Sequence, residues 1–339
     1  MEVHTNIPLK NYTTMKLGGN ARFITDVHSQ EEIAAVYKNA KSHSLNVFVI
    51  GGGSNVIARD EDYDGLIMHI RVPGFEIKTD DLNSTTIRLG AGEEWDKTVQ
   101  KIIDLQLSGV EAMSGIPGTV GGTPIQNVGA YGQEIADTLE SVEAYDTKTD
   151  TFVTLTSAEC GFSYRTSIFR EKEQGRYIIS HITITLSKSS PQPPFYESLQ
   201  AYFDAHDIRL YTLQIVRDAV LAIRANKLPD PKIYPNTGSF FKNTIVEDWQ
   251  INDLKVIDPT IPVYDMGDGH FKIPTGWLIE HAGLKGKLLH GMRINEMNCL
   301  VLINESAQSY DDLARARDEI IDTVRDTFRI QIEQEPLEI

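Results

Sequence analysis

The stretch SGIPGTVGGTPIQNVGAYG, residues 114–132, decides how the rest of this chain is interpreted. Its glycines, at positions 115, 118, 121, 122, 129 and 132, are too closely spaced for a regular helix or strand. Ordering so flexible a backbone costs conformational entropy, which a long ligand lying against the exposed backbone would offset. A glycine-rich linker is the alternative, but it fits less well because several residues of the stretch are apolar and favour burial. These are Ile116, Val120, Ile125 and Val128.

A second glycine cluster, GGGSN at residues 51–55, follows VFVI at 47–50, an apolar run that predicts a buried strand. Consecutive glycines permit positive φ and close backbone approach, the conditions for a nest of N–H groups around phosphate. A Rossmann fingerprint would need glycine where Val56 stands, and the sequence has no GxxxxGK[ST] motif. The usual NAD-binding and Walker motifs are therefore excluded, while a tight structural turn remains the alternative.

The segments around these clusters predict a mixed fold. Helices are predicted at residues 31–42, 95–103 and 309–328. A further helix is predicted around Val216, Ala219, Val220 and Ile223, which recur at helical spacing. Strands are predicted at residues 66–70, 86–92, 298–304 and 330–339. Within residues 138–187, segments of alternating pattern are separated by turn residues, which predicts antiparallel hairpins. The proline- and serine-rich residues 188–198 predict a loop or an interdomain crossing. The fold class is therefore α+β.

Composition narrows the function. The 339 residues carry 48 acidic and 32 basic side chains, a formal charge of −16 that disfavours nucleic acid but leaves room for one small phosphorylated ligand. Cys160 and Cys299 lie in apolar surroundings, which indicates core residues in a reducing compartment. The start of the sequence has no signal-peptide pattern and no stretch is apolar enough to span a membrane, so a cytoplasmic protein is expected. The scattered histidines predict no metal site.

Two further segments combine polar groups that could carry chemistry. CGFSYRTSIF, residues 160–169, places Tyr164 beside Arg165, and an arginine among apolar residues usually pairs with a carboxylate or a phosphate. A buried ion pair is the structural alternative. KLPDPKIYPNTGSFFKN, residues 227–243, places Ser239 between a glycine and two phenylalanines with lysines nearby. Taken alone, Ser239 would more often be a cap or turn residue.

Taken together and in this order, GGGSN, SGIPGTVGGTPIQNVGAYG, YRTSIF, KLPDPK and GSFFKN resemble the UDP-N-acetylenolpyruvoylglucosamine reductase family, over almost the whole chain. The resemblance implies an α+β architecture: a vanillyl-alcohol-oxidase-like, two-lobed FAD-binding domain and a separate α+β substrate-binding domain. The expected boundaries are 1–72 for the first lobe, 73–190 for the second lobe and 191–339 for the C-terminal domain, with residues 330–339 returning to the active site. The loop around Tyr196 resembles the longer of the family's two types.

The resemblance implies an NADPH-dependent, FAD-mediated reduction of UDP-N-acetylglucosamine enolpyruvate to UDP-N-acetylmuramate for peptidoglycan synthesis, cell wall biogenesis, cell shape and cell division. Hydride addition to the enolpyruvyl double bond moves charge onto the neighbouring carbon and the carboxylate, so the site needs fixed donors and one positioned acid. Ser239 is expected to donate the proton, Arg165 to polarise the carboxylate and Glu335 to support the enol form. The enzyme is expected to be a monomer.

Binding residues are also implied by the resemblance. Those expected to hold a non-covalent FAD are Gly51, Gly52, Gly53, Ser54, Asn55, Ser114, Gly115, Ile116, Pro117, Gly118, Thr119, Gly122, Asn127, Gly129, Ala130 and Tyr131. Those expected to contact the substrate are Tyr164, Tyr196, Lys227, Asn243 and Asn298.

Two departures from the family pattern bear on the expected site residues. The pattern Glu-Pro-Glu-Val is replaced by Glu333, Gln334, Glu335 and Pro336. We align Glu335 as catalytic because it keeps the spacing from the end of the preceding helix, and Glu333 stays an alternative. Asn295 and Asn298 stand where the family has His and Gln, so the substrate contacts there are open.

Two other functions are considered. An FAD oxidase of the same superfamily often carries a histidine for covalent flavin attachment near the glycine turn, where this chain has Ser54 and Asn55. A non-catalytic sugar-nucleotide sensor would not need Arg165, Ser239 and a terminal glutamate together. Both are disfavoured.

Overall fold

The antiparallel hairpins expected between residues 138 and 187 are present in the computed structural model, which describes residues 2–267 and 269–339. They belong to a five-stranded sheet in which every pairing is antiparallel. In spatial order the strands are β11 (Thr151–Thr156), β10 (Leu139–Asp146), β12 (Tyr177–Ser187), β7 (Ser84–Gly90) and β6 (Phe75–Asp80). Val142 pairs with Ile182, and Ile184 pairs with Ile87, and all four side chains are buried. These cross-strand apolar pairs fix the register of the sheet.

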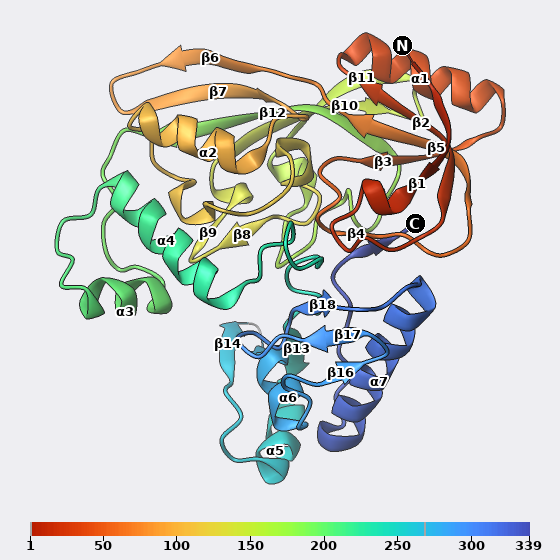
Figure 1. Cartoon of the computed structure of the whole chain (residues 1–339). Helices are drawn as coiled ribbons and strands as arrows, with labels where there is room; N and C mark the ends of the chain where they lie inside the picture. Colours follow the sequence, from red (N-terminus) through yellow and green to blue (C-terminus); the bar gives the residue numbers. More distant parts are fainter. Residues whose placement is uncertain (1, 268) are drawn as a thin grey trace. The chain divides into compact units, whose positions relative to one another are not determined.

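A four-stranded sheet also contacts helix α1 (Gln30–Ser42), which Figure 1 shows near β2 and β10. Its strands, in order, are β1 (His4–Pro8), β2 (Asn20–Val27), β5 (Tyr63–Ile70) and β3 (Asn46–Ile50), and β5 is parallel to both β2 and β3. The hydroxyl of Ser29 caps α1 by accepting the Glu32 N–H at 3.2 Å. Because α1 contacts β3 and β5 as well as β10 and β12, it joins the two sheets into one core.

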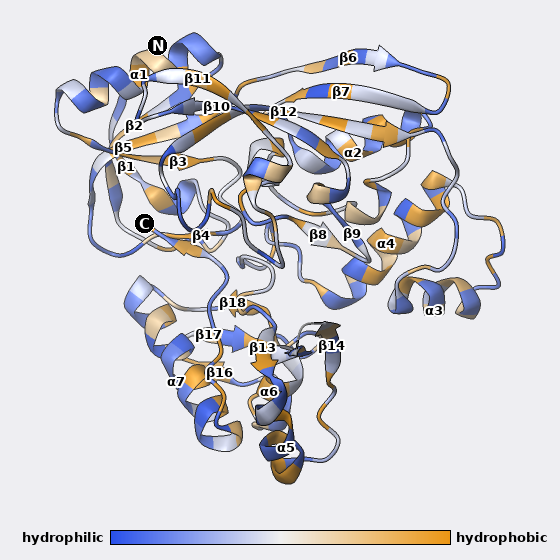
Figure 2. Cartoon of the chain, turned by 180° about the vertical axis from the view of Figure 1, so that it is seen from behind, coloured by the Kyte–Doolittle hydropathy of each residue, from blue (hydrophilic) through white to orange (hydrophobic). Residues whose placement is uncertain are grey.

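Three more helices complete this part of the chain. Helix α2 (Trp95–Asp104) buries Trp95, Val99, Ile102 and Ile103, the residues predicted to face inward. Helices α3 (Glu197–Ala205) and α4 (Leu213–Lys227) pack against each other through a smaller apolar cluster that includes Phe203. In Figure 2, hydrophobic residues recur among hydrophilic ones along α4, as expected for a helix with one buried face.

The described chain forms two units. The first comprises Met1–Ile7, Ala21–Gly53 and Tyr63–Ala225, and the second comprises Pro8–Asn20, Ser54–Asp62 and Asn226–Ile339. The glycine turn after β3 is therefore one of the places where the chain passes from the first unit to the second.

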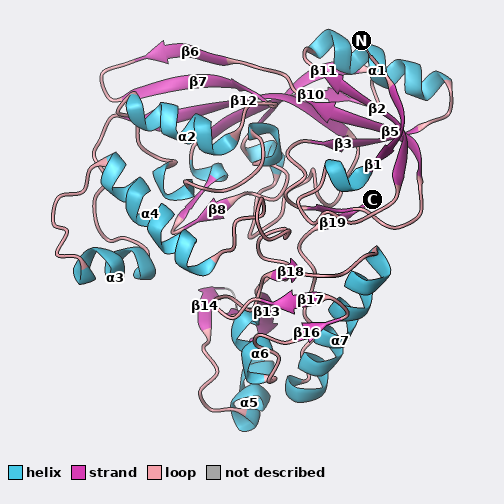
Figure 3. Cartoon of the chain, viewed as in Figure 1, coloured by secondary structure: helices cyan, strands magenta, loops and turns pink. Residues whose placement is uncertain are grey.

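The second unit is built from short strands and three helices, shown in magenta and cyan in Figure 3. One sheet has the order β13 (Thr244–Glu247), β15 (His270–Ile273), β14 (Tyr264–Gly267), and another has the order β16 (Leu288–Leu289), β17 (Met292–Ile294), β18 (Leu302–Asn304). The helices are α5 (Asp248–Ile257), α6 (Thr275–His281) and α7 (Tyr310–Phe328). Ser309 caps α7 as predicted, because its hydroxyl accepts the Asp312 N–H at 3.1 Å.

Each unit also contains shorter elements. In the second unit, β4 (Val56–Ile57) pairs in parallel with β19 (Leu337–Glu338). In the first unit, β8 (Gly129–Ala130) pairs with β9 (Gln133–Glu134). The short 3₁₀ helices are Leu9–Asn11, Glu111–Met113, Val120–Gly122, Ile135–Asp137 and Ala158–Cys160.

Three strand predictions were too long. The predicted strand 298–304 is reduced to Leu302–Asn304, because the side-chain oxygen of Asn298 accepts the Leu300 N–H at 3.1 Å and so closes a turn. The predicted strand 330–339 is reduced to Leu337–Glu338, because Pro336 has no N–H to continue a ladder. The predicted strand 86–92 ends at Gly90. Helix α3, which begins at Glu197 near the end of the segment expected to be a loop, was not predicted.

Both cysteines behave as predicted from their apolar surroundings. Cys160 and Cys299 are buried and free. Burial raises the pKa of the Cys160 thiol to about 12, so it stays protonated at neutral pH. Among residues 2–267 and 269–339, no helix combines the length and the apolar character needed to cross a membrane.

Candidate active site

The two glycine segments predicted to bind a cofactor lie against each other within the first unit. A Cβ atom added to Gly51 would lie 2.4 Å from the Thr119 Oγ1 atom, and one added to Gly52 would lie 2.8 Å from the Cα atom of Gly118. Gly53 adopts a left-handed conformation, with φ of 63°. No side chain larger than hydrogen fits at Gly51 or Gly52, which explains the glycines at this turn.

Backbone hydrogen bonds hold one side of the segment 114–132. The Gly115 N–H donates to the Asp96 Oδ1 atom at 2.6 Å, the Val120 N–H donates to the Glu93 carbonyl at 2.8 Å, and the Gly121 N–H donates to the Ala91 carbonyl at 2.9 Å. The left-handed conformations of Gly115 and Gly118, with φ of 73° and 118°, allow this path. The segment is therefore ordered by its own contacts, as its apolar residues predicted.

Gly122 marks the open side of this segment. It is exposed, and a Cβ atom added to it would meet no other atom within 4 Å. Gly122 is not required by a left-handed turn, because its φ is not among the positive values of the chain. A backbone that is anchored on one side and bare on the other fits a cofactor lying along it, as the glycine content suggested.

Arg165 belongs to the first unit and contacts the glycine segment. Its φ is 54°, and its Nη2 atom donates to the carbonyl of Gly129 at 2.9 Å. In the part of the chain that the structure describes, no carboxylate forms an ion pair with Arg165, so the predicted alternative of a buried ion pair is wrong. A backbone carbonyl leaves the positive charge uncompensated, and the guanidinium remains suited to an anionic ligand.

Tyr131, Tyr164 and Tyr196 also belong to the first unit. The rings of Tyr131 and Tyr196 meet edge to face with centroids 6.2 Å apart, which places the loop before α3 beside the glycine segment. Burial raises the pKa of the Tyr131 phenol, whereas the Tyr196 side chain is 52% exposed. The ring of Tyr164 lies 5.9 Å from the guanidinium carbon of Arg165.

Ser239 and Glu335 are brought together in the second unit. Ser239 forms a bridge with Val301, and the next residue, Phe240, donates its N–H to Leu300 and accepts the Glu335 N–H at 2.8 Å. The segment containing Ser239 therefore lies between the chain at residues 300–301 and the C-terminal segment. Phe240 and Phe241 are fully buried, which fixes the backbone on which Ser239 is carried.

The two candidate glutamates differ in their surroundings. Glu335 is 9% exposed, whereas the side chain of Glu333 is 73% exposed and lies 3.6 Å from the Lys242 ammonium. The burial of Glu335 and its backbone hydrogen bond to Phe240, the residue after Ser239, favour Glu335 over Glu333. Close to Ser239, the buried Thr237 Oγ1 atom finds no hydrogen-bond partner within residues 2–267 and 269–339.

The remaining predicted substrate residues lie in the second unit. The Asn243 side-chain oxygen accepts the Thr275 N–H at 3.2 Å. Lys227 is exposed at the end of α4, and its carbonyl accepts a hydrogen bond from the Asn295 amide at 3.2 Å. The side-chain oxygen of Asn298 is used in the turn at Leu300. Of the two uncertain asparagines, Asn295 is therefore the one held beside Lys227.

Arg224 in α4 was missed by the sequence reasoning. Its Nε atom lies 3.1 Å from where a Cβ of Gly115 would be, and neither a hydrogen bond nor an ion pair engages it within the described residues. Burial lowers the pKa of its guanidinium, and the nearby carboxylate of Asp96 is already held by Arg217 at 2.7 and 2.9 Å. The signal that could have found it was a second arginine in α4, three residues before Lys227.

No group of three or more His, Cys, Asp or Glu side chains suited to a metal ion occurs among the residues that the structure describes. The predicted site residues in the two units carry hydroxyl, guanidinium and carboxyl groups.

Comparison with known proteins gives the family. A family model described as an FAD binding domain matches residues 21–156, and one described as the C-terminal domain of UDP-N-acetylenolpyruvoylglucosamine reductase matches residues 230–339. Proteins named UDP-N-acetylenolpyruvoylglucosamine reductase from Flavobacterium johnsoniae and Ralstonia nicotianae are 38% and 37% identical to this chain over 336 and 335 residues. These alignments cover 99% of both chains in the first case and 98% of both in the second.

The fold agrees with this comparison. The crystal structure of UDP-N-acetylenolpyruvylglucosamine reductase from Thermus caldophilus matches with a TM-score of 0.68 over 100% of this chain and 99% of its own, at 23% identity. The expected α+β architecture, an FAD-binding domain followed by a separate C-terminal domain, is confirmed. The chain therefore belongs to the UDP-N-acetylenolpyruvoylglucosamine reductase family.

Proposed function

We propose that this chain is an FAD-dependent oxidoreductase that uses NADPH to reduce the enolpyruvyl group of UDP-N-acetylglucosamine enolpyruvate, giving UDP-N-acetylmuramate for peptidoglycan synthesis. The observation that carries the proposal is the 38% identity to a reductase of this name across 99% of both chains. We also propose that the enzyme is a cytoplasmic monomer, and that its domains are 1–72, 73–190 and 191–339. The buried free thiols of Cys160 and Cys299 support a reducing compartment.

The glycine segments are proposed to hold FAD without a covalent bond. The anchored backbone at residues 115–121 and the bare backbone at Gly122 support this role. When bound, FAD supplies two-electron hydride chemistry, with NADPH as the source of the hydride. The protein residues have the other tasks, which are to bind the anionic substrate, to orient its double bond and to provide a proton.

We propose that Ser239 provides that proton. Reduction adds a hydride to the terminal carbon of the double bond and a proton to the neighbouring carbon. A serine hydroxyl is a weak acid, and it can act because the carbanion-like intermediate is a strong base and because the hydroxyl is held in place. The two backbone neighbours of the Ser239 segment, at residues 300–301 and 335, support such a fixed position.

Charge on the substrate carboxylate is proposed to be met by Arg165, with Glu335 supporting the enol form. Among the described residues, Arg165 donates a hydrogen bond to the Gly129 carbonyl and forms no ion pair, and Glu335 is buried beside Phe240. We further propose that Arg224 binds the substrate diphosphate together with Tyr196 and Lys227. A guanidinium that burial disfavours, and that has no counterion among the described residues, gains most from an anionic ligand.

The experiment that tests the function measures the two half-reactions separately. NADPH should bleach the flavin of the purified enzyme, and UDP-N-acetylglucosamine enolpyruvate should then restore its absorbance. Ser239→Ala should leave bleaching near the parental rate and slow the recovery by roughly 10² to 10⁴-fold, the loss typical of a positioned acid. Ser239→Cys should regain part of this rate, because a thiol keeps a transferable proton.

Ser306→Ala is the matched control, because Ser306 is exposed in the same unit. It should change neither half-reaction. A parental recovery rate in Ser239→Ala would show that the proton comes from another group. A flavin that NADPH bleaches but that the enolpyruvyl substrate does not reoxidise in the parent enzyme would contradict the proposed substrate.

A further inference from the structure

The backbone on both sides of Glu335 is fixed within the second unit. The Lys242 N–H donates to the Glu333 carbonyl at 2.9 Å, and the Glu335 N–H donates to the Phe240 carbonyl at 2.8 Å. Beyond Pro336, the Leu337 N–H donates to the Asn55 carbonyl at 3.0 Å. Glu335 therefore lies where the chain leaves one partner segment, residues 240–242, and reaches the next, at Asn55.

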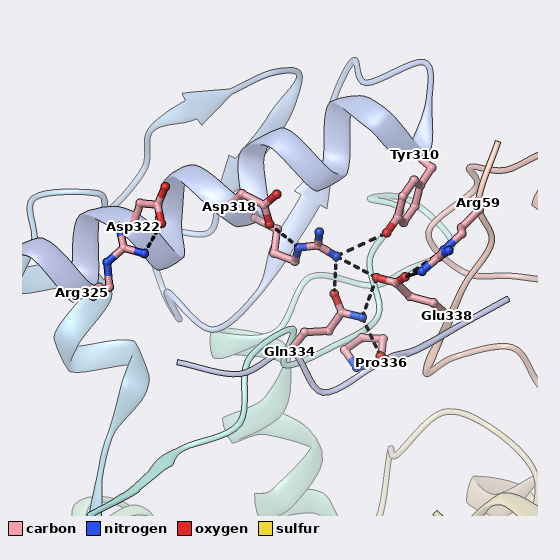
Figure 4. Close-up of polar contacts among 9 residues, drawn as sticks. Arg59, Tyr310, Asp318, Asp322, Arg325, Gln334, Pro336 and Glu338 are labelled. Carbon is pink, nitrogen blue, oxygen red and sulfur yellow. Dashed lines mark hydrogen bonds and ion pairs between the residues drawn. The ribbon is translucent and has the colours of Figure 1, made fainter. Parts of the chain in front are cut away.

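A side-chain network spans this point, as Figure 4 shows. The Gln334 amide donates to the carbonyl of Pro336 at 2.9 Å and to the Glu338 Oε1 atom at 3.2 Å. The Arg317 Nη1 atom in α7 donates to the Gln334 Oε1 atom at 3.1 Å and to the Glu338 Oε1 atom at 2.7 Å. One guanidinium thus joins the residue immediately before Glu335 to a residue three positions after it.

Two further groups orient this guanidinium. Its Nε atom donates to the Asp318 carboxylate at 2.8 Å, and Nη1 also reaches the Tyr310 hydroxyl at 3.4 Å. On the far side, Arg59 donates to the second oxygen of Glu338 at 2.6 and 3.0 Å. The network therefore ties α7 to the C-terminal segment and to the chain that follows the glycine turn, all inside the second unit.

Burial and charge indicate that this network is persistent. The side chains of Arg317 and Glu338 are each 18% exposed, which limits screening by water. Burial opposes the charge of Glu338, but its hydrogen bond from Arg59 and its other partners lower the pKa of this carboxyl overall. Glu338 is consequently ionised across the neutral range, so the network should not change with pH there.

We propose that Arg317 is a positioning residue for Glu335, acting by holding Gln334 and Glu338 on either side of it. The inference rests on the proposed function, since the role of Glu335 is itself proposed there. Arg317 does not need to touch the substrate. Its effect should pass through the orientation of the Glu335 carboxyl, because a displacement of about 1 Å in a reacting group can cost about 100-fold in rate.

The test uses Arg317→Met in the flavin-loaded enzyme, because methionine keeps much of the side-chain length and removes every donor. Reduction of the flavin by NADPH should stay within about two-fold of the parent, since Glu335 has no task in that half-reaction. Reoxidation by UDP-N-acetylglucosamine enolpyruvate should slow by about 10 to 100-fold, in the range of a misplaced reacting group. Arg317→Lys should regain part of the rate by donating one of the lost hydrogen bonds.

Arg325→Met is the matched control on the same helix. The Arg325 side chain is 48% exposed and pairs with the Asp322 carboxylate at 2.8 Å on the helix surface, as Figure 4 also shows. Both half-reactions should be unchanged in this variant. Far-ultraviolet circular dichroism and flavin content should match the parent in each variant that is compared. If Arg317→Met fails to fold, Gln334→Met removes the same link without altering α7 and should give the same slow reoxidation.

A double-mutant cycle separates positioning from a merely structural effect. If Arg317 acts through Glu335, Arg317→Met combined with Glu335→Gln should reoxidise no more slowly than Glu335→Gln alone. If the losses of reoxidation rate in the two single variants multiply in the double variant, the proposal is overturned. A parental reoxidation rate in Arg317→Met, together with slow reoxidation in Glu335→Gln, would also overturn it. A parental rate in Glu335→Gln would remove its catalytic role and with it the positioning role. Failure of the parent enzyme to reoxidise would instead contradict the proposed function.

Discussion

Replacing Asp96 by asparagine should destabilise the first unit and weaken its hold on FAD. The Asp96 carboxylate accepts two hydrogen bonds from the Arg217 guanidinium, at 2.7 and 2.9 Å, and one from the Gly115 N–H at 2.6 Å. These bonds join α2, α4 and the glycine segment. In Asp96→Asn the amide group would face the guanidinium with one donor in place of an acceptor, leaving the Arg217 charge uncompensated.

The expected cost follows from the burial of this pair. The Arg217 side chain is 8% exposed and that of Asp96 is 31% exposed, so we take the lower end of the roughly 3 to 5 kcal/mol typical of breaking a buried pair. A loss of about 3 kcal/mol should lower Tm by roughly 6 to 12 °C in a unit of about 200 residues. Asp322→Asn, which breaks a surface pair with Arg325, should cost less than about 0.5 kcal/mol.

The dependence on pH has a definite sign. Burial opposes the charge of Asp96, but the hydrogen bonds from Arg217 and Gly115 lower the pKa of this carboxyl overall. A group with a lowered folded-state pKa adds stability above its unfolded-state pKa of about 3.9, and loses it as the pH falls through the folded-state value. The free energies of unfolding of the parent and Asp96→Asn should therefore show their full difference at pH 7. This difference should shrink only below about pH 4.

Thermal unfolding followed by circular dichroism, with flavin fluorescence as a second signal, measures this effect. Dialysis of Asp96→Asn against buffer should release flavin faster than the parent does, because the Gly115 N–H has lost its charged acceptor. A Tm within about 2 °C of the parent, well below the expected shift, would refute the assigned strength of the pair. A difference between parent and variant that stays constant from pH 7 to pH 3 would refute the assigned charge state.

Three further outcomes are expected. Denaturing the holoenzyme should release FAD into the supernatant, and yellow colour that stays with the precipitated chain would contradict non-covalent binding. Tyr196→Phe should raise KM for the sugar nucleotide by about ten-fold or more with kcat nearly unchanged, because a hydrogen bond to a charged group contributes about 1.5 to 3 kcal/mol. An unchanged KM would remove Tyr196 from the site. Arg224→Met should likewise raise KM, and Arg224→Lys less so, whereas Arg209→Met at an exposed ion pair should have no effect.

The sequence by itself determined the family, the cofactor class and most regular elements. Glycine spacing at residues 51–55 and 114–132 is a local property, because it reports backbone conformations that other residues would strain. Helix α2 and the cap at Ser309 were predictable for the same reason, since apolar periodicity and capping act within a few residues. The motif around Ser239 identified a candidate proton donor without any knowledge of its neighbours.

Only the tertiary structure decided which polar groups are paired and which are free. The choice between Glu333 and Glu335 depends on the burial of one and the exposure of the other, which follows from how the C-terminal segment pairs with residues 240–242. Arg165 bonds to a carbonyl where an ion pair was considered, and Arg317 joins Gln334 to Glu338 across a sequence separation that no local pattern predicts. Such pairings require groups distant in sequence to meet in space, and their energies depend on the water that folding removes around them.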